Sequence, residues 1–168
     1  MEARELPEDL AAELAGRTPI PCDDPRIHAY GVTLEAMARL GRLFDRHLQE
    51  ACGLSQSWFE ALLRIERSGG IMTMSELASQ VALSPGGVTR MVDRLVERGL
   101  VARHDCPSDR RVQYVVITDQ GRGRLAEALE VHIEDLDRHF TGRMTPDERS
   151  VLVEIMERLR RQERGPRR

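Results

Sequence analysis

Two helix-start signals that lie close together, at Thr73 and Ser84, constrain the fold of this chain more than any other feature. Glu76 follows Thr73 at the spacing of a capping box, which predicts a short helix that begins there. Ser84 can cap a second helix, and Pro85 suits its first turn because the proline ring fixes φ and no N–H is needed there. Only a two-residue turn separates the predicted helices, so this stretch predicts a helix-turn-helix.

The second of these helices, predicted over Ser84–Arg98, is amphipathic. Its apolar residues recur at steps of three and four and are Val88, Met91, Val92 and Leu95. The remaining surface carries small and cationic side chains, including two glycines, each of which weakens a helix by ~1 kcal/mol relative to alanine. Close approach of a nucleic-acid backbone is one reason for such glycines. A solvated amphipathic helix that merely tolerates them is the other interpretation.

Two β-rich runs follow, Leu100–His104 and Val112–Ile117, separated by a polar, turn-rich loop that predicts a hairpin. A hairpin directly after a helix-turn-helix is a wing, and Arg110 and Arg111 would lie at its tip. A guanidinium group can enter a narrow minor groove, where the negative potential of DNA is focused. The competing interpretations are a solvated charged turn and a helix pair that has only a structural role.

The formal net charge of −3 averages two unlike regions. Residues 1–24 hold seven acids and two arginines, whereas residues 71–125 hold eight arginines and six acids. A local basic field can therefore exist on a chain that is acidic overall. All 25 basic residues are arginine, so arginine enrichment alone is weak evidence for nucleic-acid binding.

The composition also restricts the compartment and the chemistry. No apolar run is long enough for a membrane span and the first residues are acidic, unlike a secretory signal, so we expect a cytoplasmic protein. The three cysteines have no CxxC spacing, which indicates neither a disulfide framework nor a zinc site, and no cofactor is expected. The patterns GxSxG, HExxH and GxxxxGK are absent, so an enzyme is not expected.

Several further helices are predicted on both sides of this region. Helical patterns occupy residues 6–16 and 27–51, a third starts after Ser55, a long one runs over 118–140, and a last one starts at the capping box that Thr145 opens. One subunit cannot easily cover so many apolar helix stripes. Dimerisation therefore has a physical motive.

Five features follow one another along the chain: Leu77-Ala78, the helix from Ser84, Leu95–Val101, Asp109-Arg110-Arg111 and Ile117–Gly121. In this order they resemble the MarR family of winged helix-turn-helix regulators. The most specific element is an Asp-x-Arg in the wing followed by a strand and a (Leu/Ile)-Thr-x-x-Gly motif. The resemblance covers roughly residues 27–164 and leaves residues 1–24 outside it.

The resemblance implies a mainly α fold with a small β-hairpin wing, and a homodimer in which the first long helix and the last two helices intertwine. It implies a winged helix-turn-helix DNA-binding region over 55–117, a helical dimerisation region over 25–54 and 118–164, and an acidic N-terminal extension over 1–24. The second helix would lie in the major groove and the wing in the minor groove. A self-complementary dimer predicts a palindromic operator, and repression is the family's commoner outcome.

Arg90 is the best candidate for reading a base edge, because arginine bonds both acceptors of guanine; such a contact is typically worth ~1–3 kcal/mol. Arg111 matches the arginine of the family's wing motif and is the expected minor-groove residue. Asp109 is expected to orient Arg111 or Arg103 rather than touch DNA, and Asp93 is expected to pair with a neighbouring arginine. The full set of expected DNA-contacting residues is Thr73, Ser75, Ser84, Pro85, Gly87, Thr89, Arg90, Arg94, Arg110 and Arg111.

The family resemblance implies control by a small aromatic or phenolic effector. Basic residues that could meet its carboxylate are His28, Arg39, Arg42 and His47. Solvated side chains or ion pairs between subunits explain these residues equally well or better.

Two other functions compete with an effector-controlled regulator. The first is thiol-based peroxide sensing through Cys22, although the adjacent acids Asp23 and Asp24 disfavour a reactive thiolate. The second is a winged-helix module that contacts only proteins and does not bind DNA.

Overall fold

The computed structural model describes residues 20, 22–81, 83–109 and 111–162. The helix predicted over residues 6–16 and the wing residue Arg110 lie outside the described residues. Contacts divide the chain into two units, residues 1–37 and residues 38–168. No helix in the described ranges is long and apolar enough to cross a membrane.

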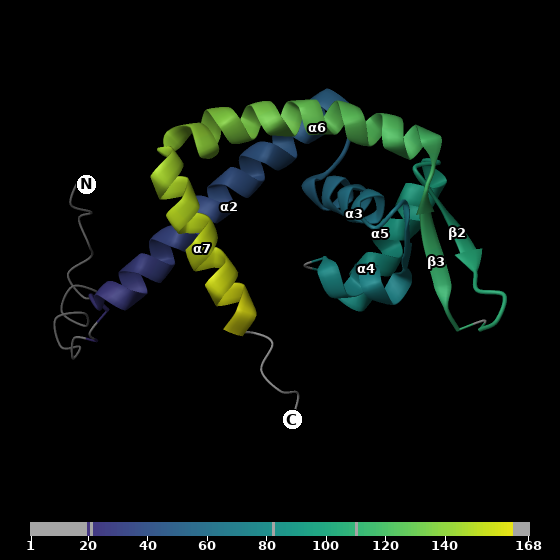
Figure 1. Cartoon of the computed structure of the whole chain (residues 1–168), viewed down its shortest axis with the longest axis horizontal. Helices are drawn as coiled ribbons and strands as arrows, with labels where there is room; N and C mark the ends of the chain where they lie inside the picture. Colours follow the sequence, from purple (N-terminus) through teal and green to yellow (C-terminus); the bar gives the residue numbers. More distant parts are fainter. Residues whose placement is uncertain (1–19, 21, 82, 110, 163–168) are drawn as a thin grey trace, which may run out of the picture. The chain divides into compact units, whose positions relative to one another are not determined.

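The predicted fold class is confirmed: the described residues form six α-helices and a small antiparallel sheet (Figure 1). The elements, in chain order, are α2 (Pro25–Cys52), α3 (Gln56–Arg67), β1 (Ile71–Thr73), α4 (Met74–Gln80), α5 (Pro85–Glu97), β2 (Val101–Asp105), β3 (Gln113–Ile117), α6 (Asp119–His139), the short 3-10 turn η1 (Thr141–Arg143) and α7 (Pro146–Gln162). Helix α2 crosses the boundary between the two units. The division of the chain into an extension, a dimerisation region and a DNA-binding region stays a prediction.

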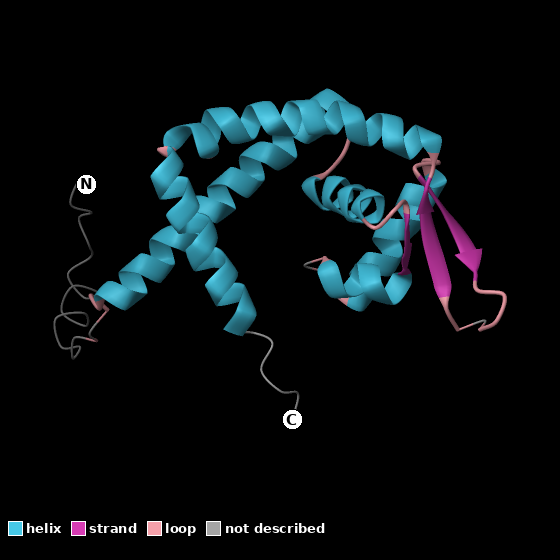
Figure 2. Ribbon diagram, in the orientation of Figure 1, coloured by secondary structure: helices cyan, strands magenta, loops and turns pink. Residues whose placement is uncertain are grey.

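The sheet has three strands in the order β1-β3-β2, and both pairs are antiparallel. Strand β1 pairs Thr73 with Tyr114, and β2 pairs Arg103 with Val115. Strands β2 and β3 form the predicted hairpin, which we call the wing, and helices α3, α4 and α5 lie together beside the sheet (Figures 1 and 2). Strand β1, which adds a third strand next to the hairpin, was not predicted from the sequence.

Side-chain caps fix where the helices begin. Thr73 and Glu76 form the predicted capping box of α4: the Thr73 hydroxyl accepts from the Glu76 N–H at 3.1 Å, and the Glu76 carboxylate accepts from the Thr73 N–H at 2.8 Å. Ser84 accepts the N–H of Gly87 at 3.2 Å at the start of α5. The caps predicted at Ser55 and Thr145 are present as well. Local hydrogen bonds to the backbone N–H groups left unpaired in the first helical turn therefore determine where these helices begin.

The predicted apolar stripe of α5 is buried. Val88, Val92 and Leu95 are at most 1% exposed and Met91 is 5% exposed. They join a core that α3, the sheet and the first half of α6 also line, with Phe59, Leu62 and Leu77 among its fully buried members. Helix α5 thus has one fixed orientation, with its apolar face inward.

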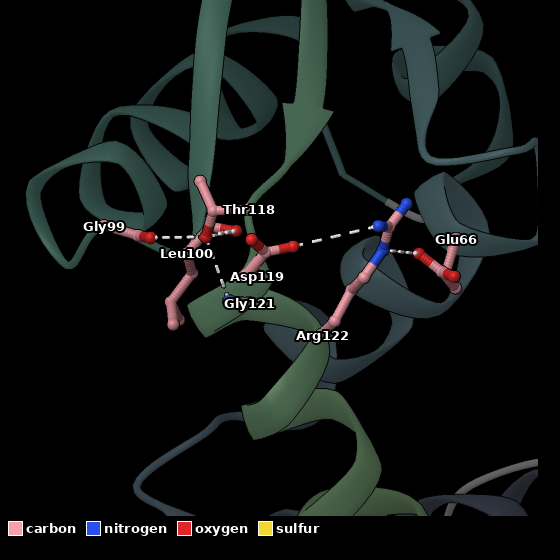
Figure 3. Close-up of polar contacts among 7 residues, drawn as sticks. All are labelled: Glu66, Gly99, Leu100, Thr118, Asp119, Gly121 and Arg122. Carbon is pink, nitrogen blue, oxygen red and sulfur yellow. Dashed lines mark hydrogen bonds and ion pairs between the residues drawn. The ribbon is translucent and has the colours of Figure 1, made fainter.

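A joint of hydrogen bonds connects the end of α5 to the start of α6 (Figure 3). The Thr118 hydroxyl donates to the carbonyl oxygens of Gly99, at 2.6 Å, and Leu100, at 3.1 Å, and accepts the N–H of Gly121 at 2.9 Å. A Cβ atom at Gly121 would collide with the Leu100 carbonyl oxygen, so this close approach requires glycine. Arg122 adds an ion pair with Glu66 of α3 at 3.0 Å.

The helices outside this core leave many apolar side chains in solvent. In the first unit, Tyr30 is 67% exposed and Leu34 is 52% exposed, both on α2. In the second unit, Ile133 of α6 and Val151, Val153 and Leu159 of α7 are each at least half exposed. Each of these helices therefore presents apolar side chains to solvent.

Candidate nucleic-acid interface

The surface of α5 opposite its buried stripe carries the residues expected to contact DNA. Thr89, Arg90 and Arg94 are exposed, as is Ser84 at the cap. Among the described residues, no carboxylate pairs with the guanidinium groups of Arg90 and Arg94. These two cations are available to an anionic partner.

The two glycines at the start of α5 differ in their surroundings. A Cβ atom at Gly87 would lie 3.2 Å from the Ser84 hydroxyl and 3.5 Å from the Leu83 side chain, so the cap itself favours glycine there. A Cβ atom at Gly86 would meet no atom within 4 Å. No contact in the described chain therefore requires glycine at position 86, although glycine there weakens the helix.

Asp93 was expected to pair with a neighbouring arginine, and in the structure it pairs with Arg103 of strand β2. The Arg103 Nη1 donates to the Asp93 carboxylate at 2.5 Å, and its Nη2 donates to the Thr89 carbonyl oxygen at 3.3 Å. The Arg103 side chain is 25% exposed and that of Asp93 is 46% exposed. One guanidinium group thus joins the wing to two successive turns of α5.

Asp109 contacts Arg111, one of the two arginines expected for it, through the backbone rather than through the guanidinium group. Its carboxylate accepts the backbone N–H of Arg111 at 2.9 Å and bonds no guanidinium group of a described residue. The orientation of Arg103 comes from Asp93 instead. Asp109 therefore fixes the backbone at the wing tip, where Arg111 is exposed to solvent.

A cleft of about 440 Å³ lies between the start of α4, α5 and the wing. Its polar lining is Thr73, Ser75, Thr89, Arg103, Arg111 and Gln113. The Thr73 hydroxyl is engaged with Glu76, donating to its carboxylate at 2.8 Å, whereas Ser75 is exposed. Gln113, which the sequence analysis did not select, reaches the cleft from the first residue of β3 and donates to Asp105 at 3.3 Å.

A second, smaller hollow of about 230 Å³ borders α5 on the α3 side. Arg90 and Arg94 line it together with Ser57 and Trp58. The Arg98 guanidinium lies 4.9 Å from the centre of the Trp58 ring, which is a cation–π contact. Ser57 and Trp58 were also missed, since only the packing of α3 beside α5 brings them to this surface.

The basic residues expected to meet an effector differ in their surroundings. His47 is paired with the buried carboxylate of Asp135 on α6, at 2.8 Å from its Nδ1. Arg42 is exposed on α2, and Arg39 on the same helix is also exposed; His28 is exposed in the first unit. His47 is thus held by a contact with another helix.

A histidine that the sequence analysis did not select lies beside this pair. The His132 ring packs against Phe59, with centroids 4.7 Å apart, and against Phe44 at 5.3 Å. Burial lowers the pKa of His132, against the smaller raising effect of Asp135 and Glu60. Its Nδ1 is buried with no hydrogen-bond partner in the described chain.

The three cysteines have unlike surroundings. Cys22 is exposed, and Cys52 is buried with a pKa that burial raises. Hydrogen bonds from the Ser108 hydroxyl and from the backbone of Ser108 and Asp109 lower the pKa of the Cys106 thiol in the wing. In the described ranges, no three His, Cys, Asp or Glu side chains lie close enough together to hold a metal ion.

Known proteins share this arrangement. A model of the MarR family matches residues 54–112, which include α3, the helix-turn-helix, strand β2 and the wing loop that follows it. The uncharacterised HTH-type transcriptional regulator YdgJ of Bacillus subtilis is 33% identical over 112 residues, which are 66% of this chain and 67% of that protein.

Two solved structures from Streptomyces coelicolor match most of the chain. Sco3205, a MarR family transcriptional regulator crystallised in complex with DNA, is 28% identical with a TM-score of 0.77 and covers 82% of this chain and 90% of its own. AbsC, another MarR family transcriptional regulator, is 26% identical with a TM-score of 0.78 over 89% of this chain and 99% of its own. With this fold, this helix-turn-helix and these relatives, the chain belongs to the MarR family of winged helix-turn-helix transcriptional regulators.

Proposed function

We propose that this protein is a homodimer that binds a palindromic operator, with α5 in the major groove and the wing in the adjacent minor groove. The observation that carries the proposal is the division of α5 into a buried apolar stripe and an exposed face with Thr89, Arg90 and Arg94. Arg90 reads a base edge, and Arg111 at the wing tip enters the minor groove. The crystallisation of Sco3205 with DNA supports this function.

Uncovered apolar surface on the long helices supports the homodimer. Apolar side chains on α2 and α7 are at least 40% exposed at Leu34, Met37, Val153 and Met156, among others. Large contiguous apolar surface is uncommon on soluble monomers and marks an interface. A second copy of the chain offers the same surfaces, and a two-fold axis makes them self-complementary.

In the proposed mechanism, the dimer represses transcription by occupying its operator and is released when a small aromatic or phenolic effector binds. Among the basic residues considered for the effector carboxylate, Arg42 on α2 remains the simplest candidate, because His47 already has the buried partner Asp135. The contact between the end of α5 and the start of α6 at Thr118 would transmit a change in the helical region to the DNA-binding surface.

The test is selection of the operator by the protein itself. Full-length protein is mixed with a pool of random-sequence duplexes, bound DNA is recovered over several rounds, and the dissociation constant of the selected duplex is measured across salt concentrations. We expect an inverted repeat whose affinity falls steeply with salt because bound phosphates release counterions. Arg90→Ala should weaken operator binding by ~1–3 kcal/mol per half-site. Enrichment of no sequence would contradict the proposal and favour a module that contacts only proteins.

The same binding assay separates the two modes of control. Release of the operator by phenolic compounds, but not by peroxide, is expected for the effector mechanism. Release by peroxide that is lost in Cys22→Ser or Cys106→Ser would instead support thiol sensing. Testing both variants matters because Cys22 is exposed, whereas Cys106 is the thiol whose pKa the surrounding hydrogen bonds lower.

A further inference from the structure

Asp93 is a half-buried acid on α5, whose other acid, Glu97, lies at the end of the helix, and a carboxylate facing DNA lowers affinity by repelling phosphates. Its neighbours along the helix surface, Arg90 and Arg94, are both cationic and exposed. The Asp93 carboxylate instead bonds Arg103, which comes from strand β2. An acid at this position therefore has a structural partner outside its own helix.

The Arg103 guanidinium spans the space between α5 and the wing. It holds the Asp93 carboxylate with Nη1 and the Thr89 carbonyl oxygen with Nη2, so it contacts two successive turns of the same helix. The backbone of Arg103 lies opposite Val115, in the central residue pair between strands β2 and β3. The contacts of Arg103 therefore join strand β2 of the wing to the part of α5 that carries Arg90.

We infer that Asp93 and Arg103 are positioning residues for operator recognition: their ion pair fixes the distance and angle between Arg90 on α5 and Arg111 on the wing. The inference rests on the proposed function, in which these two arginines reach neighbouring grooves of the same DNA. Phosphate contacts tolerate small displacements, whereas a bidentate contact to a base edge depends on precise geometry. Loss of the pair therefore lowers the preference for the operator more than it lowers binding to DNA in general.

Because Asp93 is negatively charged, a positioning role for it can be distinguished by experiment from a direct contact with DNA. Removing a carboxylate next to DNA strengthens non-specific binding, because one repulsive charge is lost. Breaking the pair at the same time weakens specific recognition. Asp93→Asn thus moves the two affinities in opposite directions, which neither a direct phosphate contact nor a general loss of fold would do.

The experiment uses full-length protein, the selected operator duplex and a scrambled duplex of equal length. Asp93→Asn and Arg103→Gln should each lower the ratio of operator to scrambled affinity by roughly tenfold, about the discrimination of one base pair. Asp93→Asn should strengthen binding to the scrambled duplex. The exchanged variant Asp93→Arg/Arg103→Asp restores the pair with reversed ends and should recover most of the ratio. Thermal unfolding of each variant confirms that it is folded.

Two outcomes overturn the inference. One is an unchanged affinity ratio in Asp93→Asn while Arg90→Ala loses operator binding; the proposed function then stands and only the positioning role is wrong. The other is an exchanged variant that is folded but no more specific than either single variant. If Arg90→Ala itself keeps full operator preference, the proposed function fails and the inference falls with it.

Discussion

Apolar residues are buried in the core around α5, whereas many of those on the long helices are exposed. Around α5, residues such as Leu62, Leu77 and Leu95 are completely buried by neighbours within the same chain. On α2 and α7, residues such as Leu34 and Val153 are more than half exposed. The first region therefore closes its core within one chain, whereas the apolar faces of the second stay exposed in one chain, as expected for the interface of the proposed homodimer.

The largest expected effect tests the self-sufficient side of this comparison. Leu95→Ala removes a fully buried side chain from α5 and should lower the free energy of unfolding by ~2–5 kcal/mol, because it creates a cavity in a packed core. Urea denaturation of the variant and the parent protein measures the change. If Leu95→Ala lowers the free energy of unfolding no more than a surface substitution does, Leu95 is not part of a closed core.

The next effect tests whether the exposed helix faces are covered by a second chain. Leu34→Lys places a charge on α2, and it should destabilise the folded dimer by ~1.5–3 kcal/mol per subunit if Leu34 is buried in the interface. The matched control is Val96→Lys, which replaces a 38% exposed residue of α5 and should change stability by less than about 0.5 kcal/mol. Denaturation at two protein concentrations together with sedimentation velocity gives stability and mass. Equal effects of the two substitutions and an unchanged mass would break the comparison.

The fold was predictable where the signals are local. Caps at Ser55, Thr73 and Ser84 and the spacing of apolar residues located the helices, because a helix start and its stripe depend on neighbours within a turn. Strand β1 was missed because its three residues carry little pattern and pair with β3 far along the chain. The close packing of Gly121 against Leu100 was hidden for the same reason.

The candidate site was predictable residue by residue but not as a set of contacts. The exposed face of α5 followed from the position of its apolar stripe. The partner of Asp93 could not be predicted, because three arginines lie near Asp93 in the sequence. Only the packing of β2 against α5 selects Arg103. His47 and Asp135 are 88 residues apart, and no local pattern links them.

A smaller effect tests the glycine at the start of α5, where the exposed face meets its expected partner. Gly86→Ala adds a methyl group in open space and should stabilise the helix by up to ~1 kcal/mol. The same methyl group should weaken DNA binding severalfold if the DNA backbone approaches at this point. Thermal unfolding and operator affinity measured on one preparation check both signs. A variant that gains stability and keeps full DNA affinity would show that Gly86 has no part in the interface.

The smallest effect asks whether the half of α6 that packs on α3 belongs to the closed core. Burial lowers the pKa of His132 below its ordinary value of 6.5, so the unfolded chain binds a proton more readily than the folded one. Stability should therefore fall as the pH drops through 6.5, because the folded chain takes up the proton less readily than the unfolded chain. His132→Phe keeps an aromatic ring and should reduce that fall in urea denaturations at pH 7 and below. An identical pH dependence in both proteins would argue that His132 is solvated.

Footprinting of the selected operator tests the central claim most directly, because it reports both the dimer and the two grooves in one measurement. Hydroxyl radical cleavage with bound full-length protein should show two symmetric sets of protected sugars, centred about 10 base pairs or a multiple of that apart, each with protection of the adjacent minor groove that Arg111→Ala removes. A single unsymmetric protected patch, or protection that is the same in Arg111→Ala, would contradict the account.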